Sequence, residues 1–114
     1  MDDARLPTAV WVDAHLRRLN EKGQGHYVAH KGAYSSGMVL LKINLLNGFC
    51  DVLVQTRGFE GVLGWMRAVG DAAVAETDAD AYIARAVERD PDLWVIEIED
   101  RNGANPFEGK LILE

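Results

Sequence analysis

Cysteine is nearly absent from this sequence: Cys50 is the single one among 114 residues, so no internal disulfide bond can form. Chains without disulfides are typical of reducing compartments, and we therefore expect a cytoplasmic protein. Long apolar runs are missing as well, since none approaches the ~18 residues that a membrane span requires. The Met-Asp-Asp start has neither the basic nor the apolar part of a signal peptide. We expect neither membrane insertion nor export.

Positive charge is in short supply. Twelve lysines and arginines stand against 18 acidic residues, which gives a net charge of -6 at pH 7. Lysine and arginine side chains that neutralise phosphates supply most non-specific affinity for nucleic acid, so this balance argues against a nucleic-acid partner. Basic residues nevertheless gather in the first third of the chain, whereas acidic residues gather later; they include Arg17, Arg18, Lys22 and Lys31.

The remaining composition is that of an ordinary globular protein. Hydrophobic residues make up 48% and charged residues 26% of the chain, which is close to the usage of typical folded domains. A chain of 114 residues is long enough to bury one core and too short for two. We therefore expect residues 1–114 to form a single domain.

Two segments show the apolar periodicity of amphipathic helices. The first spans residues 7–22 and the second spans residues 78–90. Thr77 and Asp80 resemble a capping pair at the start of the second helix, and Pro91 ends it. The apolar positions are Ala9, Val12, Leu16 and Leu19 in the first helix and Ala79, Tyr82, Ile83, Ala86 and Val87 in the second.

The strongest local signal is a β-hairpin. Residues 38–46 and 49–57 are β-rich runs joined by Asn47-Gly48, the favoured two-residue type I′ turn. This turn predicts a register in which one face is apolar and the other, with Asn44, Lys42 and Asp51, is wetter. Cys50 would then face the core as an inert small side chain. The paired residues of the apolar face would be Leu45 with Cys50, Ile43 with Val52, and Leu41 with Val54.

Further strands are expected on both sides of the hairpin. Strands near residues 26–31 and 62–67 would extend it to a four-strand meander over residues 26–67, and residues 92–100 alternate as a last strand. Residues 101–114 would form a turn and an ordered tail rather than a full strand, because Pro106 has no amide donor. The order α-β-β-β-β-α-β predicts an α+β fold with two helices and a mainly antiparallel sheet of about five strands.

No motif completes a catalytic or ligand-binding constellation. His26 and His30 would share one face of a strand, but no further residue has a spacing to them that specifies a metal site. The segment that begins at Asp100 resembles a calcium loop, but Gly103 falls at its fourth position rather than its sixth. We therefore predict no catalytic residue, no cofactor and no metal ligand, and we lean towards a protein that is not an enzyme.

Our first functional hypothesis is a non-catalytic protein-interaction module. Trp11 and His15 lie at the flanks of the apolar stripe of the first helix, and Arg17 and Arg18 lie on its polar face. Tryptophan and arginine are enriched at interface hot spots. We predict an interaction surface formed by these four residues for an unknown protein partner, which includes a second copy of the chain in a homodimer.

Our alternative hypothesis is a small-molecule-binding protein or an enzyme with a polar site near the end of the last strand. Alternation places Glu97 and Glu99 on one face, and Asp100 and Arg101 follow them. Carboxylates so placed can act as an acid/base pair or hold Mg²⁺. A solvated strand face has the same composition, so the pattern leaves both interpretations open.

Three segments carry a resemblance to a known family: Leu6-Pro7-Thr8-Ala9 with Trp11-Val12-Asp13, Ala81-Tyr82-Ile83-Ala84-Arg85, and Asp90-Pro91-Asp92-Leu93-Trp94-Val95. With Glu97-Ile98-Glu99-Asp100-Arg101 and Asn105-Pro106-Phe107, the likeness spans nearly the whole chain. The chain resembles an uncharacterised family of small alphaproteobacterial proteins catalogued as a domain of unknown function. The resemblance implies a bacterial, cytoplasmic protein, and it assigns no activity, cofactor or catalytic residue to these positions.

Overall fold

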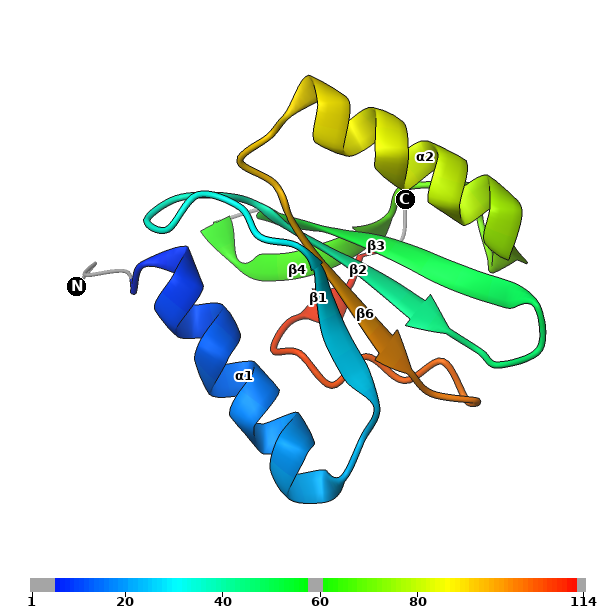
Figure 1. Cartoon of the computed structure of the whole chain (residues 1–114), viewed down its shortest axis with the longest axis horizontal. Coiled ribbons are helices and arrows are strands. Elements are labelled where there is room, and N and C mark those ends of the chain that lie inside the picture. The colour runs from blue at the N-terminus through cyan, green and yellow to red at the C-terminus, as the bar shows by residue number, and fades with distance from the viewer. Residues whose placement is uncertain (1–5, 58–60, 113–114) are drawn as a thin grey trace.

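The structure of the chain is a computed structural model, which describes residues 6–57 and 61–112. Two helices lie on either side of the central strands of a twisted sheet (Figure 1). None of the described helices is both long and apolar enough to span a membrane. The elements are α1 (Thr8–Lys22), β1 (His26–His30), β2 (Val39–Asn44), β3 (Phe49–Arg57), β4 (Leu63–Arg67), β5 (Val74–Ala75), α2 (Glu76–Arg89), β6 (Trp94–Glu99) and β7 (Lys110–Leu111).

The sheet is mixed, and this corrects the expectation of a mainly antiparallel sheet of about five strands. It has seven strands in the order β1-β6-β2-β3-β4-β7, with β5 paired to β3. The β2–β6 and β4–β7 pairs are parallel, and the other pairs are antiparallel. The α+β class with two helices is confirmed. The additional strands are β5 and β7, which are two residues long and have no periodicity to reveal them.

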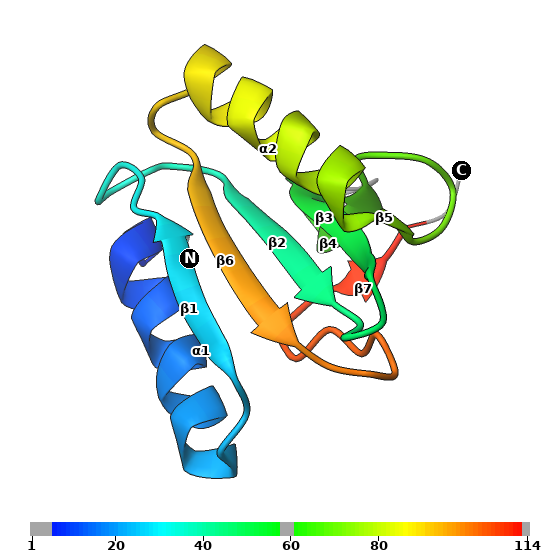
Figure 2. The same ribbon diagram turned by 45° about the vertical axis from the view of Figure 1, so that its right-hand side comes forward.

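The position of β6 also breaks the expected four-strand meander. β6 lies between β1 and β2 and pairs with both, so these two strands are not neighbours (Figure 2). The central pair of strands is buried on both faces: Val39 to Ile43 in β2 and Trp94 to Ile98 in β6 are all buried. Such near-continuous burial is typical of parallel strands with both faces covered.

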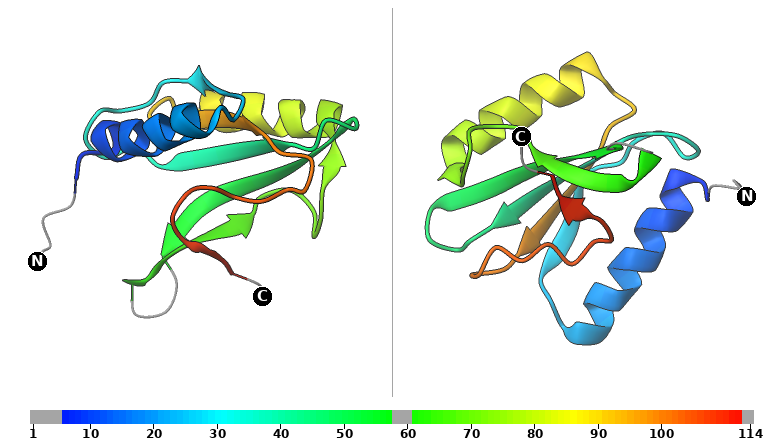
Figure 3. Two further views of the ribbon diagram at one scale, coloured as in Figure 1. Left: turned by 90° about the horizontal axis from the view of Figure 1, so that it is seen from below. Right: turned by 180° about the vertical axis from the view of Figure 1, so that it is seen from behind.

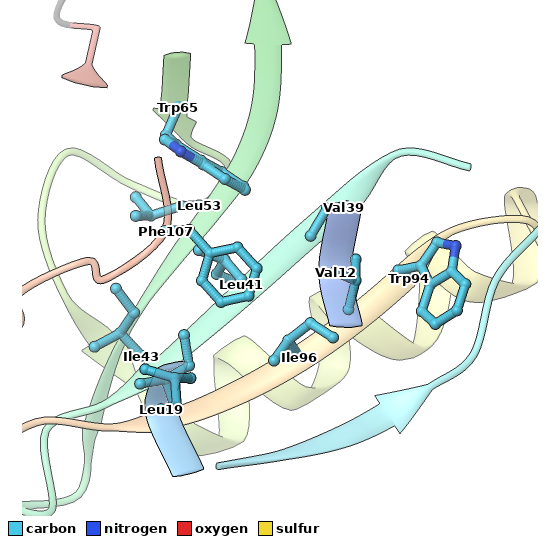
Figure 4. Packing of buried hydrophobic residues seen from close by; sticks show 11 residues of the cluster. Val12, Leu19, Val39, Leu41, Ile43, Leu53, Trp65, Trp94, Ile96 and Phe107 are labelled. Carbon is cyan, nitrogen blue, oxygen red and sulfur yellow. The ribbon is translucent and has the colours of Figure 1, made fainter. Parts of the chain in front are cut away.

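Each helix covers one face of the sheet. On the α1 face, Val12 and Leu19 pack against side chains from β2, β3, β4 and β6 (Figure 4). On the α2 face, Ala79 and Ala86 pack against Leu40, Val52 and Val95 with Cys50. Because Leu40 and Leu41 are adjacent and face opposite ways, the two clusters lie on the two sides of one strand. Burial on both faces explains why neither face of β2 is wet.

The β2–β3 hairpin has a register that differs by one residue from the prediction. Asn44 pairs with Cys50, and Ile43 pairs with Asp51. The loop has three residues rather than two, because Leu45 N donates to Phe49 O at 3.0 Å and residues 46–48 make the turn. A shift of one residue exchanges the faces of one strand relative to the other. Cys50 is buried as expected, but on the α2 face with Lys42, not beside Leu45.

The start of α2 also differs from the prediction. The helix begins at Glu76 and has no side-chain cap hydrogen bond, so Thr77 and Asp80 are not a capping pair. Glu76 and Asp78 in the first turn instead place negative charge where the helix dipole favours it. Asp80 points to the sheet and binds Lys42.

The segment after β6 folds back across the α1 face and ends beside β4 (Figure 3). Phe107 is buried among the α1 cluster, and Trp65 Nε1 donates to Glu108 O at 2.9 Å. The two residues of β7 then pair with Gly64 and Trp65 in parallel. The prediction for residues 101–114 is a turn and a tail rather than a full strand, and the structure differs in that Lys110–Leu111 join the sheet as a two-residue strand.

Candidate functional site

The predicted interaction residues Trp11 and His15 lie together on the flank of α1 that faces the C-terminal segment. The His15 ring is only 4% exposed. It stacks on Phe107 with ring centroids 4.7 Å apart and lies 4.2 Å from the Trp11 ring. Its Nδ1 donates to Trp11 O at 2.8 Å, and its Nε2 accepts from Glu108 N at 3.4 Å. His15 therefore joins α1 to the tail and presents almost no surface to a partner.

The structure places Arg17 on a different side of α1 from these rings. Arg17 forms an ion pair with Asp13, with Nε to Oδ2 at 2.9 Å, on the flank of α1 that faces β1. Arg18 is exposed and follows His15 by three residues and Trp11 by seven, positions that share one side of an α-helix. Of the four predicted residues, Trp11, His15 and Arg18 therefore share one side of α1, and Arg17 lies on another.

The predicted polar site contains a buried charge network that the sequence did not reveal. Lys42 is 6% exposed and Glu97 is 8% exposed, on the α2 face of the sheet. Lys42 Nζ lies 2.8 Å from Glu76 Oε2, 2.8 Å from Asp80 Oδ1 and 3.4 Å from Glu97 Oε1. Asn44 Nδ2 donates to the other oxygen of Glu97 at 3.0 Å. The network joins α2 to β2 and β6.

The electrostatics of this network raise the pKa values of Lys42 and of Tyr27 in β1. Burial alone lowers the pKa of Lys42, but hydrogen bonds to Asp80 and Glu76 and the charge of Glu97 outweigh it, so the pKa is raised. A hydrogen bond to Glu97, together with its charge, raises the pKa of the Tyr27 phenol. Neither group is poised to exchange a proton near pH 7. The arrangement suits a permanent internal ion pair.

Cys50 lies on the same face beneath α2. Burial is the main cause that raises the pKa of its thiol to about 11. Because the thiolate is the reactive form, a thiol with this pKa is a poor nucleophile at neutral pH.

The other predicted polar residues do not converge with Glu97. Glu99 and Arg101 are exposed, and Asp100 is half-buried. Gln24 Nε2 donates to Glu99 O at 3.1 Å and lies 3.4 Å from Asp100 Oδ2, so these residues tie the end of β6 to the turn after α1. No group of three His, Cys, Asp or Glu side chains that could hold a metal ion occurs among residues 6–57 and 61–112.

The histidines of β1 are each fixed by a backbone carbonyl. His26 Nδ1 donates to Gln24 O at 2.8 Å, and His30 Nδ1 donates to Leu93 O at 2.7 Å. The register of β1 shifts between Val28 and His30, so the strict alternation expected for these two residues is interrupted.

A largely apolar groove lies between α1 and β1, and we call it the α1–β1 groove. Its cavity volume is about 510 Å³. α1 supplies one wall, β1 and the loop that follows it supply the other, and Trp94 lies at the floor. The rim carries Asp13 and Lys31. The lining residues are Ala9, Val10, Val12, Asp13, Leu16, Val28, Lys31, Tyr34 and Trp94.

A second hollow of about 600 Å³ lies on the other flank of α1. Its lining is mixed, with Leu6, Trp11 and Met38 beside the polar Gln55 and Glu108. The N-terminal half of α1 is therefore a ridge with a hollow on each side.

Exposed apolar side chains gather around this ridge. Tyr34 is 63% exposed, and four further large hydrophobic residues near the ridge are at least one-third exposed. Single exposed hydrophobic residues are normal on a protein surface, but several that gather in one region point to an interaction site. Val10, Val28 and Tyr34 line the α1–β1 groove, and Leu6 and Met38 line the second hollow; we call these five residues the apolar patch.

Sequence reasoning missed this surface. Val10 lies outside the apolar stripe of α1, and Tyr34 lies in what reads as a polar loop. These two exposed apolar residues were the available signal, but only the fold brings them together across the groove.

The fold and its surfaces define a small α+β protein with a mixed sheet, one helix on each face and an apolar ridge at the sheet edge. The sequence model of the family described as "Protein of unknown function (DUF1491)" matches residues 6–108. The chain belongs to this family, which confirms the family resemblance drawn from the sequence.

Solved structures agree with this assignment. The crystal structure of a DUF1491 family protein from Caulobacter crescentus CB15 is 36% identical, with a TM-score of 0.83, and the match covers 95% of this chain and 100% of that one. An NMR structure of a DUF1491 family protein from the same organism is 36% identical with a TM-score of 0.78, over 95% and 97% of the chains. The solution structure of protein Atu0922 from A. tumefaciens is 25% identical with a TM-score of 0.68, over 84% and 86%. No curated protein matches the chain.

Proposed function

We propose that this chain is a non-catalytic protein-interaction module of the bacterial cytoplasm, and that its partner docks in the α1–β1 groove. The observation that carries the proposal is the apolar patch around that groove. Bacterial origin is supported by the relatives from Caulobacter crescentus and A. tumefaciens.

The groove has the chemistry of a docking surface. Val10, Leu16 and Val28 offer apolar walls, and Tyr34 offers a large ring with a polar tip at the rim. Aromatic side chains with one polar end are enriched at interfaces. A partner that inserts apolar side chains would remove this surface from water, which stabilises the complex by roughly 25 cal/mol per Å² of apolar area before the costs of association.

The distribution of charge indicates the kind of partner. Residues 6–38, which supply all of the groove except Trp94, contain four basic and two acidic residues, a net charge of +2. Residues 39–112 contain seven basic and thirteen acidic residues, a net charge of -6. Complementary charge steers association and selects partners. We therefore propose an acidic, apolar segment of another protein as the occupant, with Lys31 at the rim facing its carboxylates.

The groove is held in shape before any partner binds. The first helical amides donate to the loop that forms the wall: Thr8 N to Ser35 O at 3.2 Å and Ala9 N to Tyr34 O at 2.9 Å. Thr8 Oγ1 also donates to Gly37 O at 2.9 Å. A preformed site has a smaller entropic cost of binding.

A small-molecule or enzymatic site near Glu97, Asp100 and Arg101 is the weaker proposal. Glu97 is engaged by Lys42 and Asn44, whereas Arg101 is exposed away from it. Convergence of polar groups in one pocket is what such a site requires.

The test compares a groove variant with a matched surface variant. Val10→Ser/Tyr34→Ser removes two apolar side chains from the groove rim, and Val62→Ser/Leu111→Ser removes two exposed apolar side chains elsewhere. A partner captured from the native bacterium would be identified by mass spectrometry and purified, and its affinity measured by calorimetry. We expect the groove variant to bind at least tenfold more weakly, since two contacts of about 1 kcal/mol each exceed the 1.4 kcal/mol of one decade.

Two outcomes would contradict the proposal. Equal affinity of the groove and control variants would show that the partner binds elsewhere. A concentration-dependent mass in sedimentation, lost in the groove variant, would show that the occupant is a second copy of the chain rather than an acidic partner.

A further inference from the structure

The tip of the β2–β3 hairpin has an unusual backbone. Leu46 has a φ of 62°, and it is the only described residue other than glycine with a positive φ. This left-handed region is favourable for glycine and tolerable for asparagine, but it brings the Cβ of a leucine close to the following carbonyl. Asn47 and Gly48 stand next in the chain, yet a leucine occupies the position. The presence of leucine at position 46 therefore makes the backbone conformation of the tip energetically unfavourable.

Burial does not explain this leucine. Leu46 is 44% exposed and Phe49 is 48% exposed, so neither side chain contributes fully to the core. A glycine at position 46 would remove the steric cost and lose only a half-exposed side chain. Residues held in unfavourable conformations concentrate at functional sites, so the φ angle of Leu46 points to a functional role for the tip.

The tip is also held in one geometry. Leu46 N donates to Asn44 Oδ1 at 2.8 Å, and Phe49 N donates to Asn47 Oδ1 at 3.0 Å. Gly48 O accepts from Glu76 N at 2.9 Å, which joins the tip to the start of α2. Leu46 on this fixed loop and Phe49 at the first residue of β3 are two exposed apolar side chains that can enter a partner without a large loss of entropy.

The surroundings of the tip are acidic. Asp100 N donates to Asn44 O, and Glu99 is the residue that pairs with Asn44, so both lie at the base of the tip. Among the neighbouring cations, Lys42 is buried in its own network and Arg101 is exposed next to Asp100. The carboxylates at this end of the molecule are Glu76, Asp78, Glu99 and Asp100.

From these observations we propose that the hairpin tip is a second docking element, which inserts Leu46 and Phe49 into an apolar pocket with a basic rim on a protein partner. The tip lies at the far end of the sheet from the N-terminal half of α1 (Figure 1), so it is separate from the α1–β1 groove. The proposal therefore does not depend on the groove being occupied.

The test places a photo-crosslinking amino acid at position 46 of the full chain in the native bacterium. The control places it at position 84, where Ala84 is exposed on the outer side of α2. We expect an adduct with one protein at position 46 that is absent at position 84. Excess wild-type chain should abolish the adduct, and excess Leu46→Ser/Phe49→Ser should not. With the identified protein purified, the double variant should bind at least tenfold more weakly, and the wild-type affinity should fall as salt rises.

A stability measurement checks the strain argument separately. The Tm of Leu46→Gly should be equal to or above that of the wild type, because the steric cost disappears. Any fall in Tm beyond the error of the measurement would show that Leu46 stabilises its own fold and would overturn the argument.

Three binding results would also overturn the proposal. The first is the same adducts at positions 46 and 84, and the second is an adduct only with a second copy of this chain. The third is loss of the position-46 adduct in Val10→Ser/Tyr34→Ser, because the tip would then be part of one extended interface. The groove variant could also give an unchanged position-46 adduct and the same partner affinity as its control variant. That result would support docking by the tip and contradict docking in the groove.

Discussion

The two faces of the sheet are closed in different ways. On the α2 face, a lysine and a glutamate are buried, and Lys42 Nζ lies within 3.4 Å of carboxylate oxygens of Glu76, Asp80 and Glu97. On the α1 face, an aromatic cluster of Trp11, His15 and Phe107 packs the C-terminal segment against one side of the helix, while the other side borders the α1–β1 groove. The comparison indicates that the α2 face contributes mainly to stability, whereas the α1 face also borders the groove in which we propose that a partner docks.

The difference follows from the position of each helix on the sheet. α2 lies over the middle strands and brings Glu76 and Asp80 down onto Lys42. α1 lies beside the edge strand β1, which is only five residues long and carries a bulge. A short, bulged edge strand resists pairing with another strand, so the apolar surface beside it is available to side chains rather than to a β-ladder.

The largest effect on stability is expected from loss of the buried ion pair on the α2 face. Lys42→Met leaves the buried Glu97 without its cation, and removal of one member of a buried ion pair typically costs about 3–5 kcal/mol. The free energy of unfolding in urea would measure this loss. Lys110→Met, at an exposed lysine of β7, is the matched control and should change stability by less than about 0.5 kcal/mol. A loss below about 1 kcal/mol for Lys42→Met would show that Glu97 is adequately hydrated without it.

Removing a ring from the aromatic cluster on the α1 face should have the next largest effect on stability. Phe107→Ala removes the ring that contacts His15, Trp11 and Trp65, and large-to-small changes of this kind cost about 3 kcal/mol or more. Thermal unfolding by circular dichroism would record the change. Leu111→Ala, in the same segment but exposed, serves as the control. Equal Tm values for the two variants would mean that the C-terminal segment does not close this face.

Alkaline pH should distinguish the two faces further, because the side chains whose pKa values are raised lie on the α2 face. A group whose pKa is raised by folding binds more protons in the native state, so its contribution to stability is lost as pH rises. For Cys50, with a pKa of about 11 against 9.0, the free energy of unfolding should fall by about 2–3 kcal/mol between pH 9 and 11. Tyr27 and Lys42 add losses of the same sign at higher pH.

Urea unfolding at a series of pH values would measure this fall. Cys50→Ala lowers stability at every pH because it removes a buried side chain, but its stability should decline less steeply between pH 9 and 11. Parallel curves for the variant and the wild type would argue that another group titrates in this range.

The smallest effect is expected at the groove. Val10→Ser/Tyr34→Ser should change the free energy of unfolding by no more than about 0.5 kcal/mol per site, as is usual for exposed positions. Chemical denaturation followed by tryptophan fluorescence is sufficient. A loss of about 2 kcal/mol or more is typical of core substitutions and would mean that Val10 and Tyr34 are packed as core residues.

Much of the fold could be predicted from local patterns. The helix expected over residues 7–22 corresponds to Thr8–Lys22, and the one expected over residues 78–90 corresponds to Glu76–Arg89. Periodicity of apolar residues is a property of one segment and its water-facing side, so it is visible without the rest of the chain. The runs that became β2, β3 and β6 were found for the same reason.

Pairing between segments was less accessible. Asn47-Gly48 predicts a two-residue turn, but the side chain of Asn44 binds Leu46 N and holds a three-residue loop, which shifts the register by one. The parallel contact of β2 with β6 leaves no mark on either segment, because buried strands read alike in both orientations. Lys42 within an apolar run was the one available sign of a buried ion pair.

The candidate site was predictable only in part. Trp11 and His15 were identified on α1, but their contact with Phe107 depends on the path of the C-terminal segment. The groove requires Val10 and Tyr34 to meet across a gap between a helix and a loop. Such a surface exists only once distant segments are packed.

The place of β6 in the sheet has a consequence for how the chain is synthesised and folded. His26 pairs with Ile98, and Val39 pairs with Trp94, so two early strands are joined through one of the last to leave the ribosome. Contacts between residues so distant in sequence are formed late and slow folding, because a long loop must close first. The nascent chain can build the β2–β3–β4 unit early, but β1 acquires its ladder only when β6 arrives. The centre of the sheet can therefore form only after residues 94–99 have been synthesised.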